Sequence, residues 1–170
     1  MNKLITLLAV VWIITSAFAT IELNSYSAKT LPDITIQDLE GNKVNISDHG
    51  KNGKITVINF WATWCGPCKK ELSNINELFA DWQERYDMEF LAISIDDARN
   101  TAKVKSYANG QGWEFDVLLD MNQDLKRAMN FQTPPHTVLV DQSGNIVFTH
   151  TGYKEGDEYI LEEEIAALSD

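Results

Sequence analysis

Two cysteines stand close together in the stretch "WATWCGPCKKE", and the 170-residue chain has no others. A disulfide that only stabilises a fold gains from closing a long loop, because its effect grows with the number of residues enclosed. A bridge between Cys65 and Cys68 encloses almost no chain. The spacing therefore predicts a redox pair that opens and closes, with this disulfide as the only redox centre and no other cofactor.

The sequence around the pair predicts different tasks for the two sulfurs. A continuous apolar run, "ITVINFWA", precedes the cysteines and is typical of a buried strand, and a helical pattern follows from about Pro67 to Arg85. Cys65 would then stand at a helix N-terminus, where free backbone N–H groups and the helix dipole stabilise a thiolate. We expect Cys65 to be the exposed nucleophile. Cys68, one turn further and on the core side, would be the resolving thiol.

The residues between the cysteines suit this interpretation, although other uses stay open. Gly66 leaves the approach to the sulfur free, and Pro67 fits an early helical position because its missing N–H is not needed there. Zinc would need about four ligands, a copper chaperone could add His136 to the two thiols, and the cysteines could also be inert and buried. No metal site is predicted. His49 and His150 are expected to be surface residues without a role.

Glu71 falls on the apolar side of the predicted helix. At about 100° per residue from Cys68, it lies within the apolar arc, which spans roughly 120°. A carboxyl group on that face should be desolvated, which raises its pKa toward the range of a proton acceptor working near neutral pH. The alternative is a glutamate at the edge of the arc whose carboxylate reaches solvent. The apolar residues of the arc are Leu72, Ile75, Leu78, Phe79 and Trp82.

The rest of the chain predicts the elements that position this strand and helix. Strands separated by helices indicate parallel βαβ units, and a final hairpin adds antiparallel strands at one side. The expected fold is a three-layer α/β sandwich. Its further elements are a hairpin within 33–47, strands at 88–96 and 114–120, helices at 98–112, 121–131 and 156–168, and a hairpin at 137–150.

The N-terminus has the features of an export signal. A single Lys3 precedes a long uncharged run that ends in the small-x-small tripeptide 17–19. We predict a signal peptide at 1–19, a linker at 20–32 and one folded domain at 33–170. The alternative is an uncleaved membrane anchor, because the uncharged run is barely long enough to span a bilayer. In both cases the folded part would work outside the cytoplasm.

Composition narrows the classes of partner. With 44% hydrophobic and 23% charged residues, the chain can bury the core of one globular domain. Its formal net charge of −11 argues against binding to nucleic acid or to an anionic membrane surface, since both need clustered Lys and Arg.

Two motifs together resemble a known family. The stretches "NFWATWCGPC" and "TPPHTVLVDQSGNIV" are similar to those of the thioredoxin-like superfamily, and more narrowly of exported thiol-disulfide oxidoreductases of the TlpA/ResA type, which include cytochrome c maturation proteins. The resemblance implies a central mixed sheet, an N-terminal β-hairpin and an αβ insertion at 98–120. It also implies a bacterial periplasmic reductant of disulfides in extracytoplasmic proteins, supplied with electrons by a membrane thiol donor.

The resemblance also implies roles for single residues. Pro135 would be a cis-proline facing the disulfide and pairing with substrate, while Pro134 and His136 depart from the commoner pattern beside the expected substrate groove. Glu71 matches a glutamate near the thiols of ResA-like proteins. Asn59 stands where plain thioredoxins carry a buried aspartate, so that proton relay is not transferred.

The two tryptophans beside the motif are interpreted differently. Trp61 is expected to pack in the core. Trp64 would be a surface aromatic beside Cys65, either a platform for substrate or simple packing. Gly66 and Pro67 would border the same substrate surface.

Two further functions stay open at this stage. A thiol peroxidase is possible because peroxiredoxins share the wider fold. A metal-binding or copper chaperone would use the same fold without turnover.

Overall fold

The computed structural model describes residues 29–169 of the chain. The predicted export signal at 1–19 lies outside the described residues, as does most of the predicted linker at 20–32. Across 29–169, no helix is both long enough and apolar enough to cross a membrane. The predicted domain boundaries stay predictions.

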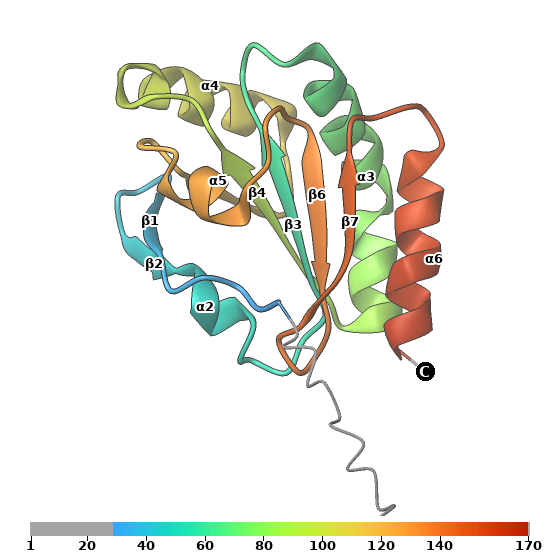
Figure 1. The fold of residues 1–170 in the computed structure, drawn as a ribbon. Helices are drawn as coiled ribbons and strands as arrows, with labels where there is room; N and C mark the ends of the chain where they lie inside the picture. The colour runs from blue at the N-terminus through green and yellow to red at the C-terminus, as the bar shows by residue number, and fades with distance from the viewer. Residues whose placement is uncertain (1–28, 170) are drawn as a thin grey trace, which may run out of the picture.

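A seven-stranded mixed sheet forms the centre of the molecule (Figure 1). Its strands lie in the order β2-β1-β5-β4-β3-β6-β7. The central three, β5, β4 and β3, are parallel, whereas the hairpins β1–β2 and β6–β7 add antiparallel strands at the two sides. The mixed sheet and its N-terminal hairpin are thus confirmed. The strands are β1 (Thr35–Asp38), β2 (Lys43–Asn45), β3 (Thr56–Trp61), β4 (Glu89–Ser94), β5 (Asp116–Leu119), β6 (His136–Val140) and β7 (Ile146–Thr151).

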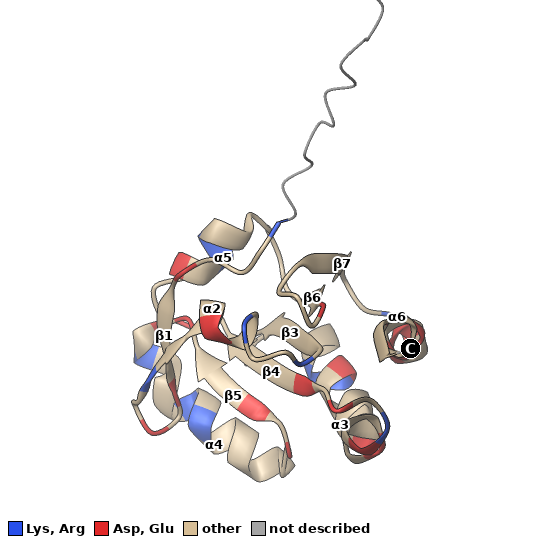
Figure 2. Ribbon diagram, turned by 90° about the horizontal axis from the view of Figure 1, so that it is seen from below, with Lys and Arg blue, Asp and Glu red and all other residues tan. Residues whose placement is uncertain are grey.

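Helices cover both faces of this sheet, which gives the predicted three layers. Figure 2 shows α3, α4 and α6 on one side of the strands and α5 on the other. The predicted insertion at 98–120 forms a 3-10 turn, α4 and β5. The short α2 leads into β3, where the Thr56 hydroxyl donates to the His49 carbonyl at 3.3 Å. The helices are α2 (Ile46–His49), α3 (Gly66–Tyr86), α4 (Thr101–Gln111), α5 (Asp124–Met129) and α6 (Asp157–Ser169).

Strand β3 is the rigid base of the cysteine motif. All six of its residues are buried, as the continuous apolar run predicts. Trp61, at its C-terminal end, is fully buried and meets the ring of Trp113 edge-on with 4.9 Å between centroids. The predicted core role of Trp61 is confirmed, and the cysteine motif follows directly from this fixed end of the strand.

Helix α3 buries the predicted apolar arc against the sheet. Leu72, Ile75, Phe79 and Trp82 are buried, and Leu78 is half-buried at the margin of the arc. On its outer side α3 packs beside α6 (Figure 1). The helix is therefore held along its whole length, which fixes the orientation of its first turn.

The described end of the predicted linker packs on the domain. Leu31 is only 7% exposed, and the Ile146 N–H donates to the Lys29 carbonyl at 2.7 Å. Burial of the Leu31 side chain contributes hydrophobic free energy, which a segment of polar residues alone would not contribute. Lys29 and Leu31 thus contact the folded domain.

Candidate active site

The two cysteines lie where β3 turns into α3, as predicted. Cys65 is the N-cap of α3, with an extended backbone, and its Sγ accepts the N–H of Cys68 at 3.3 Å. Pro67 occupies the first turn of the helix. A disulfide joins Cys65 to Cys68, whose Cα atoms are 5.4 Å apart. The free N–H groups of this turn are placed to stabilise a thiolate at Cys65 when the bridge is reduced.

As predicted, Cys65 is more exposed to solvent than Cys68, but its exposed fraction is much smaller than predicted. Cys65 is 6% exposed and Cys68 is fully buried. The expectation of an exposed Cys65 is therefore wrong for the oxidised protein. The reason is that the bridge holds its Sγ against the first turn of α3.

Solvent reaches the motif from the side of three neighbouring residues. Trp64 is 64% exposed, and Gly66 and Pro67 are also exposed. A Cβ atom added at Gly66 would meet nothing within 4 Å, so the space beside Cys65 is open. Trp64 is thus a surface aromatic, whereas the substrate-binding roles of Trp64, Gly66 and Pro67 stay predictions.

A buried aspartate, which the sequence analysis did not single out, fixes the turn before Cys65. Asp96 accepts the Thr63 N–H at 2.8 Å and the Thr63 hydroxyl at 2.7 Å. The Ser94 hydroxyl donates to the same carboxylate at 2.9 Å. Charge-assisted hydrogen bonds of this kind hold their partners firmly. The available signal is an acidic residue two positions after the end of a buried strand.

Pro135 follows a cis peptide bond, as the resemblance implied. Pro135 is buried and Pro134 is half-buried. The next residue, His136, begins β6 and pairs with Phe60 of β3. The loop that carries both prolines therefore ends beside the C-terminal end of β3, where the cysteine motif starts. Substrate binding by Pro134 and Pro135 stays a prediction.

The side chain of His136 is buried. Its side chain is packed, with the ring stacked on Phe131 at 4.5 Å between centroids, and its Nδ1 lies 2.7 Å from the Thr151 hydroxyl. Burial lowers the pKa of His136 below the usual value. Across residues 29–169, no three His, Cys, Asp or Glu side chains are grouped so that they could hold a metal ion.

Glu71 is buried one turn beyond Cys68, on the same face of α3. It is 4% exposed, so the alternative of a carboxylate in solvent is wrong. The Thr137 hydroxyl donates to its Oε1 at 3.1 Å, and Asn59 donates to Thr137 at 2.9 Å. Its Oε2 makes no hydrogen bond to any described residue. Burial raises the pKa of Glu71 to about 7, which suits a group that takes up a proton near neutral pH.

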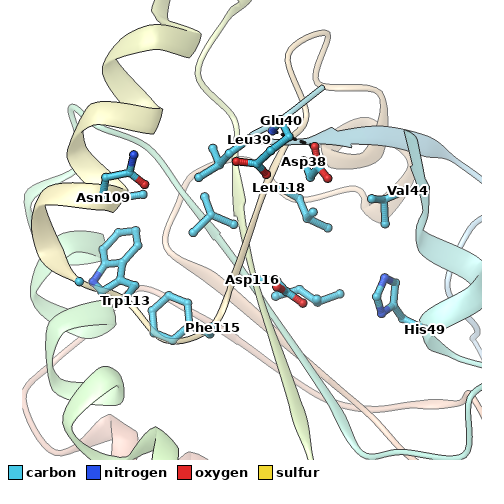
Figure 3. A pocket seen from close by; sticks show the side chains of 14 residues that line it. Asp38, Leu39, Glu40, Val44, His49, Asn109, Trp113, Phe115, Asp116 and Leu118 are labelled. Carbon is cyan, nitrogen blue, oxygen red and sulfur yellow. Dashed lines mark hydrogen bonds between the residues drawn. The ribbon is translucent and has the colours of Figure 1, made fainter. Parts of the chain in front are cut away.

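A separate pocket lies away from the cysteines. A pocket of about 590 Å³ opens between the β1–β2 hairpin, β5 and α4 (Figure 3). Neither the cysteines nor Glu71 line it. Its wall includes His49, whose Nδ1 lies 3.1 Å from a carboxylate oxygen of Glu89. His49 is therefore a half-buried, paired residue and not the simple surface residue that was expected.

Comparison with known proteins supports the same fold and motif. Residues 28–149 match the AhpC/TSA family. The chain belongs to this family.

Two relatives resemble the chain over most of its length. The thiol-disulfide oxidoreductase ResA of Geobacillus kaustophilus is 31% identical over 161 residues, which covers 94% of this chain and 90% of the relative. The ResA protein of Geobacillus thermodenitrificans is 32% identical over 135 residues, or 78% of this chain and 75% of the relative. The predicted resemblance to ResA-type proteins is confirmed.

Solved structures agree with this assignment. An uncharacterised thioredoxin-like protein from Porphyromonas gingivalis is 44% identical, with a TM-score of 0.73 over 82% of this chain and 91% of the other. A putative thiol:disulfide interchange protein DsbE from Chlorobium tepidum is 25% identical, with a TM-score of 0.75 over 84% and 97%. The thioredoxin-like fold of this member of the AhpC/TSA family is thus shown.

Proposed function

We propose that the protein is a thiol-disulfide oxidoreductase that works outside the cytoplasm as a reductant of disulfides in other proteins. The observation that supports this most directly is the Cys65–Cys68 disulfide at the N-terminus of α3, with Cys65 at the surface side and Cys68 fully buried. The names of the ResA relatives and of the DsbE-like structure support the same chemistry.

The reaction proceeds in two exchanges. In the reduced protein the Cys65 thiolate attacks one sulfur of the substrate disulfide, which forms a mixed disulfide and releases the first substrate sulfur as a thiolate that takes a proton from water. Cys68 then gives its proton to Glu71 and attacks the Cys65 sulfur, which releases the second substrate sulfur as a thiolate that takes a proton from water. Two electrons pass from the cysteine pair to the substrate, and the described disulfide is the product.

The Cys65–Cys68 disulfide must be reduced again before the next cycle. We propose a membrane thiol donor for this step and a role like that of cytochrome c maturation proteins, with the predicted signal or anchor at 1–19 placing the domain in the bacterial periplasm. Two features support this: the export-like N-terminus and the similarity to ResA.

Reduction of insulin disulfides tests the proposed reaction. Cys65→Ala should abolish turnover, because the attacking sulfur is lost, and Cys68→Ala should accumulate a mixed disulfide with substrate on Cys65. Turnover retained by Cys65→Ala would refute the assignment.

The thiol peroxidase alternative is tested in the same preparation, since it requires consumption of hydrogen peroxide and a sulfenic acid on one cysteine.

A redox titration against glutathione determines the direction. A reductant should have a potential well below that of the glutathione couple in an oxidising compartment, and about 30 mV corresponds to about 1.4 kcal/mol for this two-electron exchange. A potential far above it would assign the protein as an oxidant instead.

Retention of copper by the reduced protein, lost in Cys65→Ser, would favour the chaperone alternative.

A further inference from the structure

A row of polar residues crosses the sheet from its centre to its edge. Asn59 on β3 pairs with Thr137 on β6, and Thr137 pairs with His150 on β7. Paired residues of antiparallel strands point to the same face of a sheet. Thr137 donates to Glu71 of α3, so this row lies on the face that α3 and α6 cover (Figure 1). Buried Glu71 is thereby connected to a strand at the edge of the sheet.

A small cavity lies between Glu71 and His150. Its volume is about 30 Å³, and its lining includes Glu71, Thr137, His150, Asp157 and Glu158. This is room for about one water molecule, and a water is stable in a cavity that offers several polar partners. The Oε2 of Glu71 is buried without a partner among the described residues. A buried oxygen in this condition is costly unless a water satisfies it.

His150 stands between this cavity and solvent. Its side chain is 41% exposed, and its Nε2 lies 3.2 Å from the Oδ2 of Asp157. That oxygen also accepts the N–H of Lys154 at 2.7 Å, which fixes Asp157 in place. The imidazole is therefore held by Asp157 through Nε2, and Nδ1 makes no hydrogen bond to any described residue. Histidine is the side chain type that ordinarily gains and loses a proton near neutral pH.

The other ionisable groups of the cavity are occupied. Glu158 accepts hydrogen bonds from the Tyr153 hydroxyl at 2.8 Å, the Gly156 N–H at 3.0 Å and the Asn74 amide at 3.1 Å. Burial opposes ionisation, but these bonds hold the pKa of Glu158 below its usual value. Glu158 is thereby held as an anion, and the Oδ2 atom of Asp157 is bound to His150 and to the Lys154 N–H. We therefore take His150 as the group that transfers the proton at this cavity.

The side of Glu71 that faces the cysteines offers little access to solvent. Cys68 is fully buried one turn before Glu71, and Cys65 is only 6% exposed. This burial disfavours a direct return of the Glu71 proton past the two sulfurs. The cavity on the opposite side reaches the edge of the sheet at β7.

We propose that Glu71 exchanges its proton with solvent through one water in this cavity and through His150, on the side of β7 and α6. This inference rests on the proposed function. The proton leaves the Cys68 sulfur for Glu71, passes to the water and then to Nδ1 of His150, and enters bulk solvent. No electrons move along the route, since the electron pair left on the Cys68 sulfur forms the bond to Cys65. His150 is a positioning residue for proton transfer and does not touch the reacting sulfurs.

The test is the single-turnover rate at which Cys68 resolves a mixed disulfide preformed on Cys65. His150→Gln keeps a polar side chain that can still contact Asp157 but cannot carry a proton. It should slow resolution by about tenfold near neutral pH, less than the contribution of the direct proton acceptor. His150→Ala should be slowed similarly, and imidazole added to the buffer should restore its rate. A residue with a purely structural role would not respond to imidazole.

The matched control is His49→Gln, which alters another half-buried histidine paired with a carboxylate, far along the chain and outside this cavity. It should resolve at the wild-type rate. Wild-type rates in both His150 variants, together with slow resolution in Glu71→Gln, would overturn the route and leave the proposed function intact. Turnover in Cys65→Ala would instead overturn the function itself. His150→Gln carries the test alone if His150→Ala does not fold.

Discussion

Glu71 and Glu89 are both shielded from water but have opposite protonation behaviour. Glu71 has one hydrogen-bond donor on Oε1 and no partner on Oε2 among the described residues, and burial raises its pKa to about 7. Glu89 is also desolvated, yet hydrogen bonds from His49, Thr56 and Asn52 hold its pKa below the usual value. Glu71 is more deeply buried than Glu89 and lacks a charged partner such as His49, and both differences favour the protonated form of Glu71 near neutral pH.

The positions of the two glutamates fit these states. Glu71 lies on α3 one turn beyond Cys68. Glu89 begins β4, and its Oε1 lies 3.1 Å from Nδ1 of His49 and 2.7 Å from the Thr56 hydroxyl. The Glu89 carboxylate therefore links α2 to the first residues of β3 and β4. We interpret Glu71 as a residue of the reaction and Glu89 as a residue of the fold.

The largest expected difference between Glu71 and Glu89 concerns the rate at which Cys68 resolves the mixed disulfide. Glu71→Gln should slow resolution of the mixed disulfide by about 10²-fold at neutral pH, because the proton acceptor is lost. Glu89→Gln should leave that rate unchanged. Stopped-flow measurement of the preformed mixed disulfide decides this, and equal rates in the two variants would remove the functional distinction.

A second difference concerns stability and pH. The folded protein keeps the Glu71 proton to about pH 7, whereas the unfolded chain loses it near the usual glutamate pKa of 4.5, so unfolding releases a proton between these pH values. Stability should therefore fall as pH rises through this window. Relative to wild type, oxidised Glu71→Gln should gain up to about 3 kcal/mol between pH 4 and pH 8. Urea unfolding at the two pH values measures it, and a gain that is independent of pH would show that Glu71 is not protonated in the fold.

A third and smaller effect concerns the pair of Glu89 with His49. Glu89 raises the pKa of His49, so this stabilisation is present below the usual histidine value of 6.5 and is lost as pH rises through the raised value. The contribution of Glu89 is present above 4.5 and is lost at lower pH as its depressed pKa is passed. His49→Gln should thus cost about 1 kcal/mol at pH 5.5 and less at pH 8.5. The reverse dependence in urea unfolding would contradict the pairing.

Local patterns were sufficient to predict the fold and the core of the site. The apolar run before the cysteines predicts a doubly buried strand, and β3 is buried at every position. The Cys-x-x-Cys spacing and Pro67 predict a helix start, and Cys65 is the N-cap. Each of these depends on residues close together in the chain, so one sequence reveals them.

The partners of the site could not be predicted because they are distant in sequence. Thr137 contacts Glu71 across 66 positions, and Asp96 contacts Thr63 across 33. Register between strands decides which side chains meet, and a pattern of apolar residues does not specify it residue by residue. For the same reason the sequence predicts only a surface residue without a role at His150, although β7 places it opposite Thr137.

Alkylation of the fully reduced protein by iodoacetamide, followed from pH 5 to pH 9 with the modified cysteine identified by mass spectrometry, tests whether Cys65 is the nucleophile. We expect rapid modification of Cys65 alone, with an apparent pKa clearly below the usual cysteine value of about 8.5, because the N-terminus of α3 stabilises its thiolate. Equal modification of Cys68, or a Cys65 that titrates at the ordinary value, would contradict it.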